Sequence, residues 1–116
     1  MRSMVDGAGL SQLRRGVLEH CVLAALAGGE RYGYELVGEL GRADGLLTSE
    51  GTIYPLLGRL RRDGFVATRW GESVSGPPRR YYRLTASGRA SLERFAGDWE
   101  RFRDAVDGML AEAIGA

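Results

Sequence analysis

The chain has 116 residues, 44% of them hydrophobic, so it can bury one modest hydrophobic core. Its formal net charge of +1 excludes the class of strongly basic nucleic-acid-binding proteins. No apolar run approaches the ~20 residues of a membrane-spanning helix, and residues 1–9 lack the apolar segment of a secretory signal, so we expect a cytoplasmic protein without a membrane segment. The single cysteine excludes an internal disulfide and fits the same reducing compartment.

The charged residues are distributed unevenly along the chain. Residues 1–47 carry five Arg against six acidic residues, residues 48–90 carry eight Arg against three, and residues 91–116 carry three Arg against six. The middle segment therefore has a net charge of +5 although the whole chain is nearly neutral. Concentrated positive charge of this kind is what an electrostatic footprint on DNA requires.

The amino-terminal region predicts one helix after a short tail. Residues 1–9 are polar and contain glycine, so we predict that they are disordered. Apolar residues at helical spacing predict a first helix over residues 10–26, which Gly28-Gly29 ends. His20 and Cys21 are neighbours on this helix and point about 100° apart, so they cannot hold one metal ion without ligands from elsewhere in the chain. We interpret them as a solvent-facing histidine beside a buried cysteine and predict no metal site.

A second, short helix is predicted over residues 32–40, with the sequence YGYELVGEL. Gly33 and Gly38 would each cost about 1 kcal/mol relative to alanine in a helix interior. Packing or a close backbone approach must therefore offset them. Residues 41–47 form a turn-rich connection to the next helix, which completes a predicted helix-turn-helix.

Residues 48–64, TSEGTIYPLLGRLRRDG, predict a helix that lies in a DNA groove. Thr48 or Ser49 can cap its first turn, and Gly64 supplies a left-handed stop. A helix start with small polar residues offers free N–H groups and the positive end of the helix dipole to a phosphate backbone. Its buried face is predicted to consist of Ile53, Leu56, Leu57 and Leu60. Its predicted contacts to bases or phosphates are Ser49, Thr52, Tyr54 and Arg59.

Two β-prone segments follow, residues 65–70 and 79–85, separated by a loop over residues 71–78 that is rich in Gly, Ser and Pro. They predict a hairpin with a loose tip. Directly after a helix-turn-helix such a hairpin is a wing, and Arg79 and Arg80 are its predicted DNA contacts. Alternation along the strand places these two arginines on opposite faces. The alternative is a solvated hairpin end whose arginines only maintain solubility.

The last segment begins at Thr85, which is the predicted helix cap, and carries an apolar seam at alternating spacings of three and four residues. A sustained period of 3.5 residues predicts packing along another long helix, and a second copy of the chain is the simplest partner. We therefore predict a homodimer; the alternative is a helix that folds back on its own domain. The predicted dimer-interface residues, which would also surround a ligand, are Leu92, Phe95, Trp99, Phe102 and Val106, and the seam continues through Met109 and Ala113.

These motifs together resemble the PadR family of transcriptional regulators, specifically its small members with one carboxy-terminal dimerisation helix. The resemblance covers about residues 13–109 and rests on VLAALAGGERYGYEL, SEGTIYPLLGRLRRDG, GPPRRYYRLT and the Gly88 that follows. It implies a winged helix-turn-helix dimer, DNA contacts from the start of the groove helix and from Arg79 and Arg80, and usually repression. Some small relatives sense flat aromatic compounds in a cleft at the dimer centre lined by a carboxy-terminal tryptophan, and Trp99 has a comparable position.

The expected fold is mainly α with a small β-hairpin: a winged helix-turn-helix domain over residues 10–85 and a long dimerisation helix over residues 86–116. The expected function is that of a dimeric repressor that binds a palindromic operator in double-stranded DNA, with release by a small aromatic ligand as a hypothesis. The alternative is a winged-helix protein-interaction module that does not bind DNA. One histidine, no clustered metal ligands and no phosphate-binding loop argue against an enzyme, and we predict no cofactor.

Overall fold

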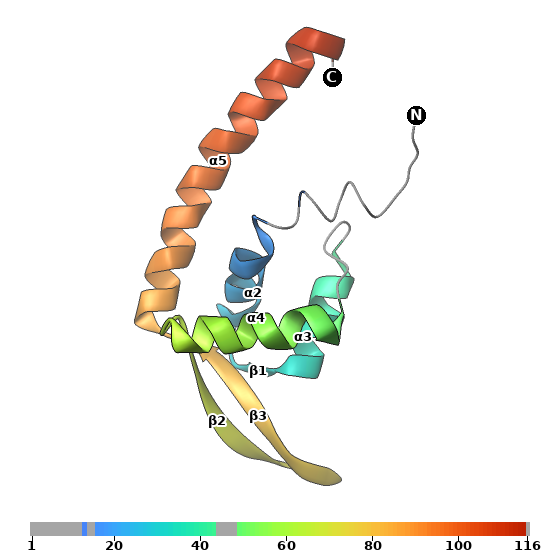
Figure 1. Cartoon of the computed structure of the whole chain (residues 1–116), viewed down its shortest axis with the longest axis vertical. Coiled ribbons are helices and arrows are strands. Elements are labelled where there is room, and N and C mark those ends of the chain that lie inside the picture. Colours follow the sequence, from blue (N-terminus) through green and yellow to red (C-terminus); the bar gives the residue numbers. More distant parts are fainter. Residues whose placement is uncertain (1–12, 14–15, 44–48, 116) are drawn as a thin grey trace.

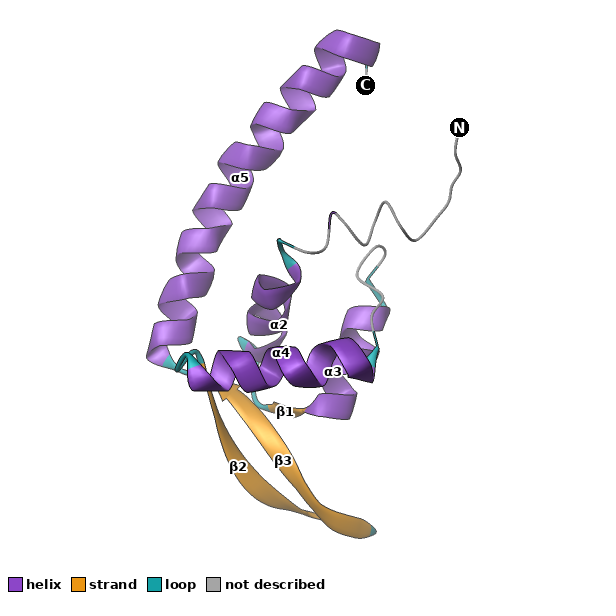
Figure 2. Ribbon diagram, in the orientation of Figure 1, coloured by secondary structure: helices purple, strands orange, loops and turns teal. Residues whose placement is uncertain are grey.

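The computed structural model describes residue 13, residues 16–43 and residues 49–115. Helices α2, α3 and α4 lie together at the centre of the molecule; the β2–β3 hairpin projects on one side and α5 on the other (Figure 1, Figure 2). The mainly α fold with a small β-hairpin is confirmed, with one added strand. The elements in chain order are α2 (Leu18–Leu26), β1 (Arg31–Tyr32), α3 (Gly33–Gly41), α4 (Glu50–Arg62), β2 (Val66–Ser73), β3 (Gly76–Leu84) and α5 (Ala86–Ile114).

The first described helix is shorter than the sequence predicts. Gly16 and Val17 form a turn, and α2 begins at Leu18, so a continuous helix over residues 10–26 is wrong in its described part. Glycine pays a large entropic cost in a helix interior, which favours a break at this point. The predicted disorder of residues 1–9 lies outside the described residues.

The core lies where the three central helices meet the sheet. The predicted buried face of α4 is confirmed, because all four of its apolar residues are buried. The helix ends as predicted at Gly64, whose φ of 82° is left-handed. Phe65 N–H donates to the Leu60 carbonyl at 3.0 Å, which completes a Schellman motif. The buried core residues are Leu18, Val22, Leu23, Leu26, Leu36, Leu40, Ile53, Leu56, Leu57, Leu60, Val66 and Tyr82.

The sheet has three antiparallel strands in the order β1-β3-β2. Strand β1 pairs Arg31 with Tyr82 and Tyr32 with Tyr81, so the prediction that Tyr32 begins the second helix is wrong. Tyr32 is instead the residue before α3, and its N–H donates to Glu35 Oε1 at 3.0 Å. A strand of two residues has no alternation, and the sequence therefore gives no sign of it.

The hairpin is more regular than predicted. Strands β2 and β3 run to a two-residue turn at residues 74–75, so the loose tip over residues 71–78 is wrong. Pro77 and Pro78 lie in β3 beyond the end of β1, beside an irregularity in the pairing with β2 between Gly71 and Ser73. Proline has no N–H to donate to a neighbouring strand. It is tolerated here because β3 has no β1 neighbour at these positions and its pairing with β2 is irregular.

Helix α5 begins with the predicted cap. Thr85 Oγ1 accepts from the Gly88 N–H at 3.0 Å and donates to the Gly64 carbonyl at 2.7 Å. Ser91 is buried and Leu92 packs against the core, whereas every residue from position 98 to position 115 is exposed. Only the first part of α5 is therefore held by its own domain.

His20 lies at the contact between α2 and α5, so its interpretation as a solvent-facing histidine is wrong. Its ring stacks on Phe95 with centroids 4.2 Å apart and an interplanar angle of 3°. Its Nε2 is 3.4 Å from Ser91 Oγ. Neighbouring Cys21 is half-buried against the core, and this burial raises the pKa of its thiol.

We expect the substitution Gly88→Ala to lower the free energy of unfolding by about 2 kcal/mol or more. A Cβ at this position would lie 2.1 Å from the carbonyl oxygen of Phe65, which accepts from the Thr85 N–H. The first turn of α5 would have to move away from the end of α4. Gly108→Ala is the matched control, because Gly108 has open space and alanine favours the helix by about 1 kcal/mol. Urea unfolding measures both; equal stability of the two variants would contradict the account.

Candidate nucleic-acid interface

The start of α4 is exposed and carries small side chains. Ser49 is the N-cap residue, and its carbonyl accepts from Thr52 and Ile53, both at 3.0 Å. The Ser49 hydroxyl does not cap the first turn, so the prediction of a cap is wrong for Ser49; this hydroxyl lies 3.4 Å from the Thr52 hydroxyl. Thr48 lies outside the described residues. The first N–H groups of a helix have no partner within it, and here they lie beside two exposed hydroxyls.

Tyr54 joins α4 to the start of α3. A Cβ on Gly33 would lie 2.4 Å from the Tyr54 ring, so the ring can lie in this position against the start of α3 only because residue 33 is glycine. This contact offsets the unfavourable helix propensity of Gly33. Gly38 has open space around it, so no such contact offsets its helix propensity. Burial, and then the carboxylate of Glu50, raise the pKa of the Tyr54 phenol. The residue as a whole is nevertheless 43% exposed, so part of it remains available to a ligand.

Arg59 is already paired within the chain. Its Nη2 donates to Glu19 Oε1 at 2.7 Å, which links α4 to α2. The arginine side chain keeps 51% exposure, and an exposed pair of this kind contributes little to stability. Arg59 can therefore bind a phosphate only in competition with, or in addition to, this carboxylate. The sequence did not indicate the pair, because its members are 40 positions apart.

The hairpin presents Arg79 and Arg80 on opposite faces, as the strand alternation predicts. Arg80 pairs across the strands with Trp70, and its guanidinium lies 5.0 Å from the centre of the indole ring. Arg79 lies over Tyr32 of β1 at 4.3 Å. Each arginine is thus held against an aromatic ring, and such contacts restrict the guanidinium in advance of binding.

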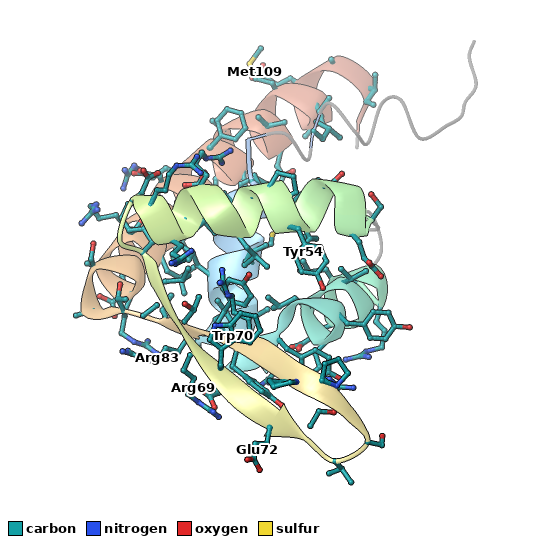
Figure 3. All side chains as sticks on the ribbon, turned by 60° about the horizontal axis from the view of Figure 1, so that its bottom comes forward. Tyr54, Arg69, Trp70, Glu72, Arg83 and Met109 are labelled. Carbon is teal, nitrogen blue, oxygen red and sulfur yellow. The ribbon has the colours of Figure 1, made fainter. Side chains whose placement is uncertain are left out.

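The face of the sheet turned away from the helices carries further positive charge (Figure 3). Arg69 lies 4.8 Å over Tyr81, whose ring meets Tyr32 edge to face at 5.6 Å. Arg69 Nε also donates to both carboxylate oxygens of Glu30, at 3.0 and 3.1 Å. This hydrogen bond lowers the pKa of Glu30. Arg69 therefore links β2 to the residue that directly precedes β1.

The predicted seam of α5 divides into two parts. Leu92 and Phe95 are half-buried against their own domain, so the fold-back alternative describes these two residues. Beyond them Trp99 is 39%, Phe102 63% and Val106 38% exposed. Trp99 lies between Phe95 and Phe102, with ring centroids 6.3 and 6.4 Å away. This part of the seam forms a continuous apolar stripe on a helix that projects from the domain.

Comparison with known proteins identifies the family. Residues 22–94, more than half of the chain, match the sequence model of the transcriptional regulator PadR-like family. The chain belongs to the PadR-like family. The transcriptional regulator Rv3488 of Mycobacterium tuberculosis is 37% identical over 83 residues, which span 72% of this chain and 76% of the relative.

Solved structures of PadR-like regulators share the fold. A PadR-family regulator from Eggerthella lenta is 36% identical, with a TM-score of 0.79 over 89% of each chain. A PadR-like regulator from Bacillus cereus is 37% identical, with a TM-score of 0.78 over 85% of this chain and 96% of the other. The protein is thus a DNA-binding transcriptional regulator with a winged-helix fold, and its family consists of regulators, not enzymes.

Two further properties of this PadR-like chain concern its described residues alone. Among them, no three His, Cys, Asp or Glu side chains cluster in a way that could hold a metal ion. None of the helices that the structure describes has the length and apolar character needed to cross a membrane.

Proposed function

We propose that this PadR-like regulator is a homodimeric repressor in which α5 joins two copies. The observation that carries the proposal is the apolar stripe from Trp99 to Met109, which is exposed in one copy of the chain. Apolar surface of this extent on a projecting helix indicates a partner, and the heptad spacing fits a second α5. The two-fold symmetry of the dimer then fixes the positions of the two winged helix-turn-helix domains relative to each other.

Each copy places the start of α4 in a major groove. In a dimeric helix-turn-helix protein the two recognition helices enter successive major grooves about 34 Å apart, so the operator is a palindrome whose half-sites lie about one helical turn apart. The exposed side chains of Ser49, Thr52, Tyr54 and Arg59 make contacts to bases or to nearby phosphates. Arg79 and Arg80 of the wing bind phosphates of the flanking minor groove.

The proposal is tested by selecting bound duplexes from a random pool. The expected product is an inverted repeat, because each half-site is read by an identical copy of α4. A pool that yields single, unrepeated sequences would overturn the dimeric arrangement. A protein that retains no duplex even in dilute salt would support the competing role, a winged-helix module that binds proteins only. That role is disfavoured because the exposed face of α4 carries hydroxyls and arginines instead of an apolar patch.

Release by a small aromatic ligand is the regulatory part of the proposal. An aromatic compound between Trp99 and its symmetry mate would favour a different angle between the two wings. Repression is lifted only if that angle fits DNA less well, because a ligand shifts an equilibrium only by its differential affinity for the two states. The partial exposure of the Trp99 indole between two phenylalanines supports such a site.

We expect ethidium, a planar cation, to quench Trp99 fluorescence at micromolar concentration in the Trp70→Phe variant. The physical reason is stacking of the cation on the indole face. The Trp99→Phe variant, which keeps Trp70, is the control and should show no quenching in the same range. Unquenched Trp99, or equal quenching of both variants, would rule out the ligand site and would leave the interface role of Trp99 in place.

A further inference from the structure

The Trp70–Arg80 pair lies where the inner face of the sheet passes from core to open surface. Alternate residues of a strand share a face, so Trp70 and Arg80 share theirs with the core residues Val66 and Tyr82. Those two are 3% and 7% exposed, whereas Trp70 is 64% exposed. Figure 3 shows Trp70 between α4 and the hairpin. The pair therefore occupies the open angle between the groove helix and the wing.

The two side chains form one surface with apolar and cationic parts. The guanidinium of Arg80 is 5.0 Å from the indole centre, and its Nε is buried with no hydrogen-bond partner within the described residues. The indole thus holds the guanidinium near its ring, and the terminal nitrogens of Arg80 are donors that can bind another group. Arg79 cannot bind a group at this position, because it lies over Tyr32 on the opposite face of the sheet.

The backbone of DNA has the matching chemistry. One sugar–phosphate strand separates the major groove from the adjacent minor groove. A protein with a helix in the first groove and a wing in the second must have this strand in the angle between them. The strand alternates apolar deoxyribose with anionic phosphate, and phosphate contacts of this kind fix the register of a protein on the duplex.

We propose that Trp70 and Arg80 together clamp this strand, with the indole packed on a deoxyribose and the guanidinium bound to the neighbouring phosphate. The inference rests on the proposed placement of α4 and the wing on DNA. It adds Trp70 as a DNA-contacting residue and gives Arg80 a role different from that of Arg79. The clamp fixes how far the wing can turn relative to α4 on the duplex.

Affinity and salt dependence separate the two halves of the clamp. Trp70→Ala should weaken duplex binding about tenfold at every salt concentration, because an apolar contact releases no counterions. Arg80→Gln should reduce the slope of log affinity against log salt by about 0.9, the value for one phosphate. Arg83→Gln, which removes the same charge from an exposed position on the opposite face, is the control and should behave as the wild type.

Shielding of Trp70 gives a second readout that does not depend on loss of binding. In the Trp99→Phe variant Trp70 is the only tryptophan, and its quenching by acrylamide can be compared with and without a duplex in dilute salt. A severalfold fall on DNA binding is expected. Binding that leaves Trp70 as accessible as before would overturn the clamp and leave the proposed function standing. Trp70→Ala and Arg80→Gln variants that bind like Arg83→Gln would overturn the clamp and the phosphate contact proposed for Arg80, and would leave the homodimeric repressor and the contacts of α4 standing. Failure of the wild type to bind any duplex would overturn both.

Discussion

Replacing Phe102 with glutamate is expected to separate the two copies and to abolish tight binding to a palindromic operator. Phe102 is 63% exposed in the single chain, so the substitution leaves the fold of one copy intact. In a two-fold interface the new carboxylate meets the seam of the other copy and, near the axis, its own symmetry mate. An unpaired charge buried in an apolar interface costs several kcal/mol.

A loss of about 4 kcal/mol corresponds to a dimer dissociation constant raised about a thousandfold. A single copy then binds one half-site, with an affinity near the non-specific range of roughly 10⁻⁴ to 10⁻⁶ M. Sedimentation equilibrium measures the assembly, and duplex titration measures the DNA affinity. Gly108→Glu is the control, since it adds the same charge to an exposed position off the seam. A Phe102→Glu protein that stays dimeric, or a control that also dissociates, would show that the seam is not the interface.

The two long helices could be predicted from the sequence because their signals are local and repeated. Four apolar residues at helical spacing and a closing Gly64 define α4, and both its buried face and its end are confirmed. Helix α5 follows the predicted cap Thr85 and runs from Ala86 to Ile114. The periodicity could not indicate which residues of α5 pack against their own domain and which are exposed, because that depends on where α2 contacts the helix.

The features that the sequence could not indicate are short or distant in the chain. Strand β1 has two residues, too few for an alternating pattern. Glu19 pairs with Arg59, and its neighbour His20 stacks on Phe95, so adjacent residues of α2 contact α4 and α5 respectively. Such contacts follow from packing of the folded chain, and composition and spacing carry no signal of them.

Part of the candidate DNA interface could likewise be predicted from the sequence, and part could not. Residue type alone pointed to the hydroxyls at the start of α4 and to the arginine pair of the wing. Their surroundings needed the structure: the Tyr54 ring is wedged against Gly33, and Arg79 and Arg80 rest on different aromatic rings. Trp70 was the missed candidate. Strand alternation places it on the face of Tyr82, but only its exposure separates it from a core residue.

The central claim, that two copies joined along α5 read two half-sites in successive major grooves, is tested most directly by the spacing of those half-sites. In the duplex selected from the random pool, about half a helical turn, roughly five base pairs, is inserted between the two halves of the inverted repeat. A rigid dimer then has its second α4 facing the wrong side of the duplex, so we predict that affinity falls to that of a single half-site. Unchanged affinity after the insertion would contradict the account.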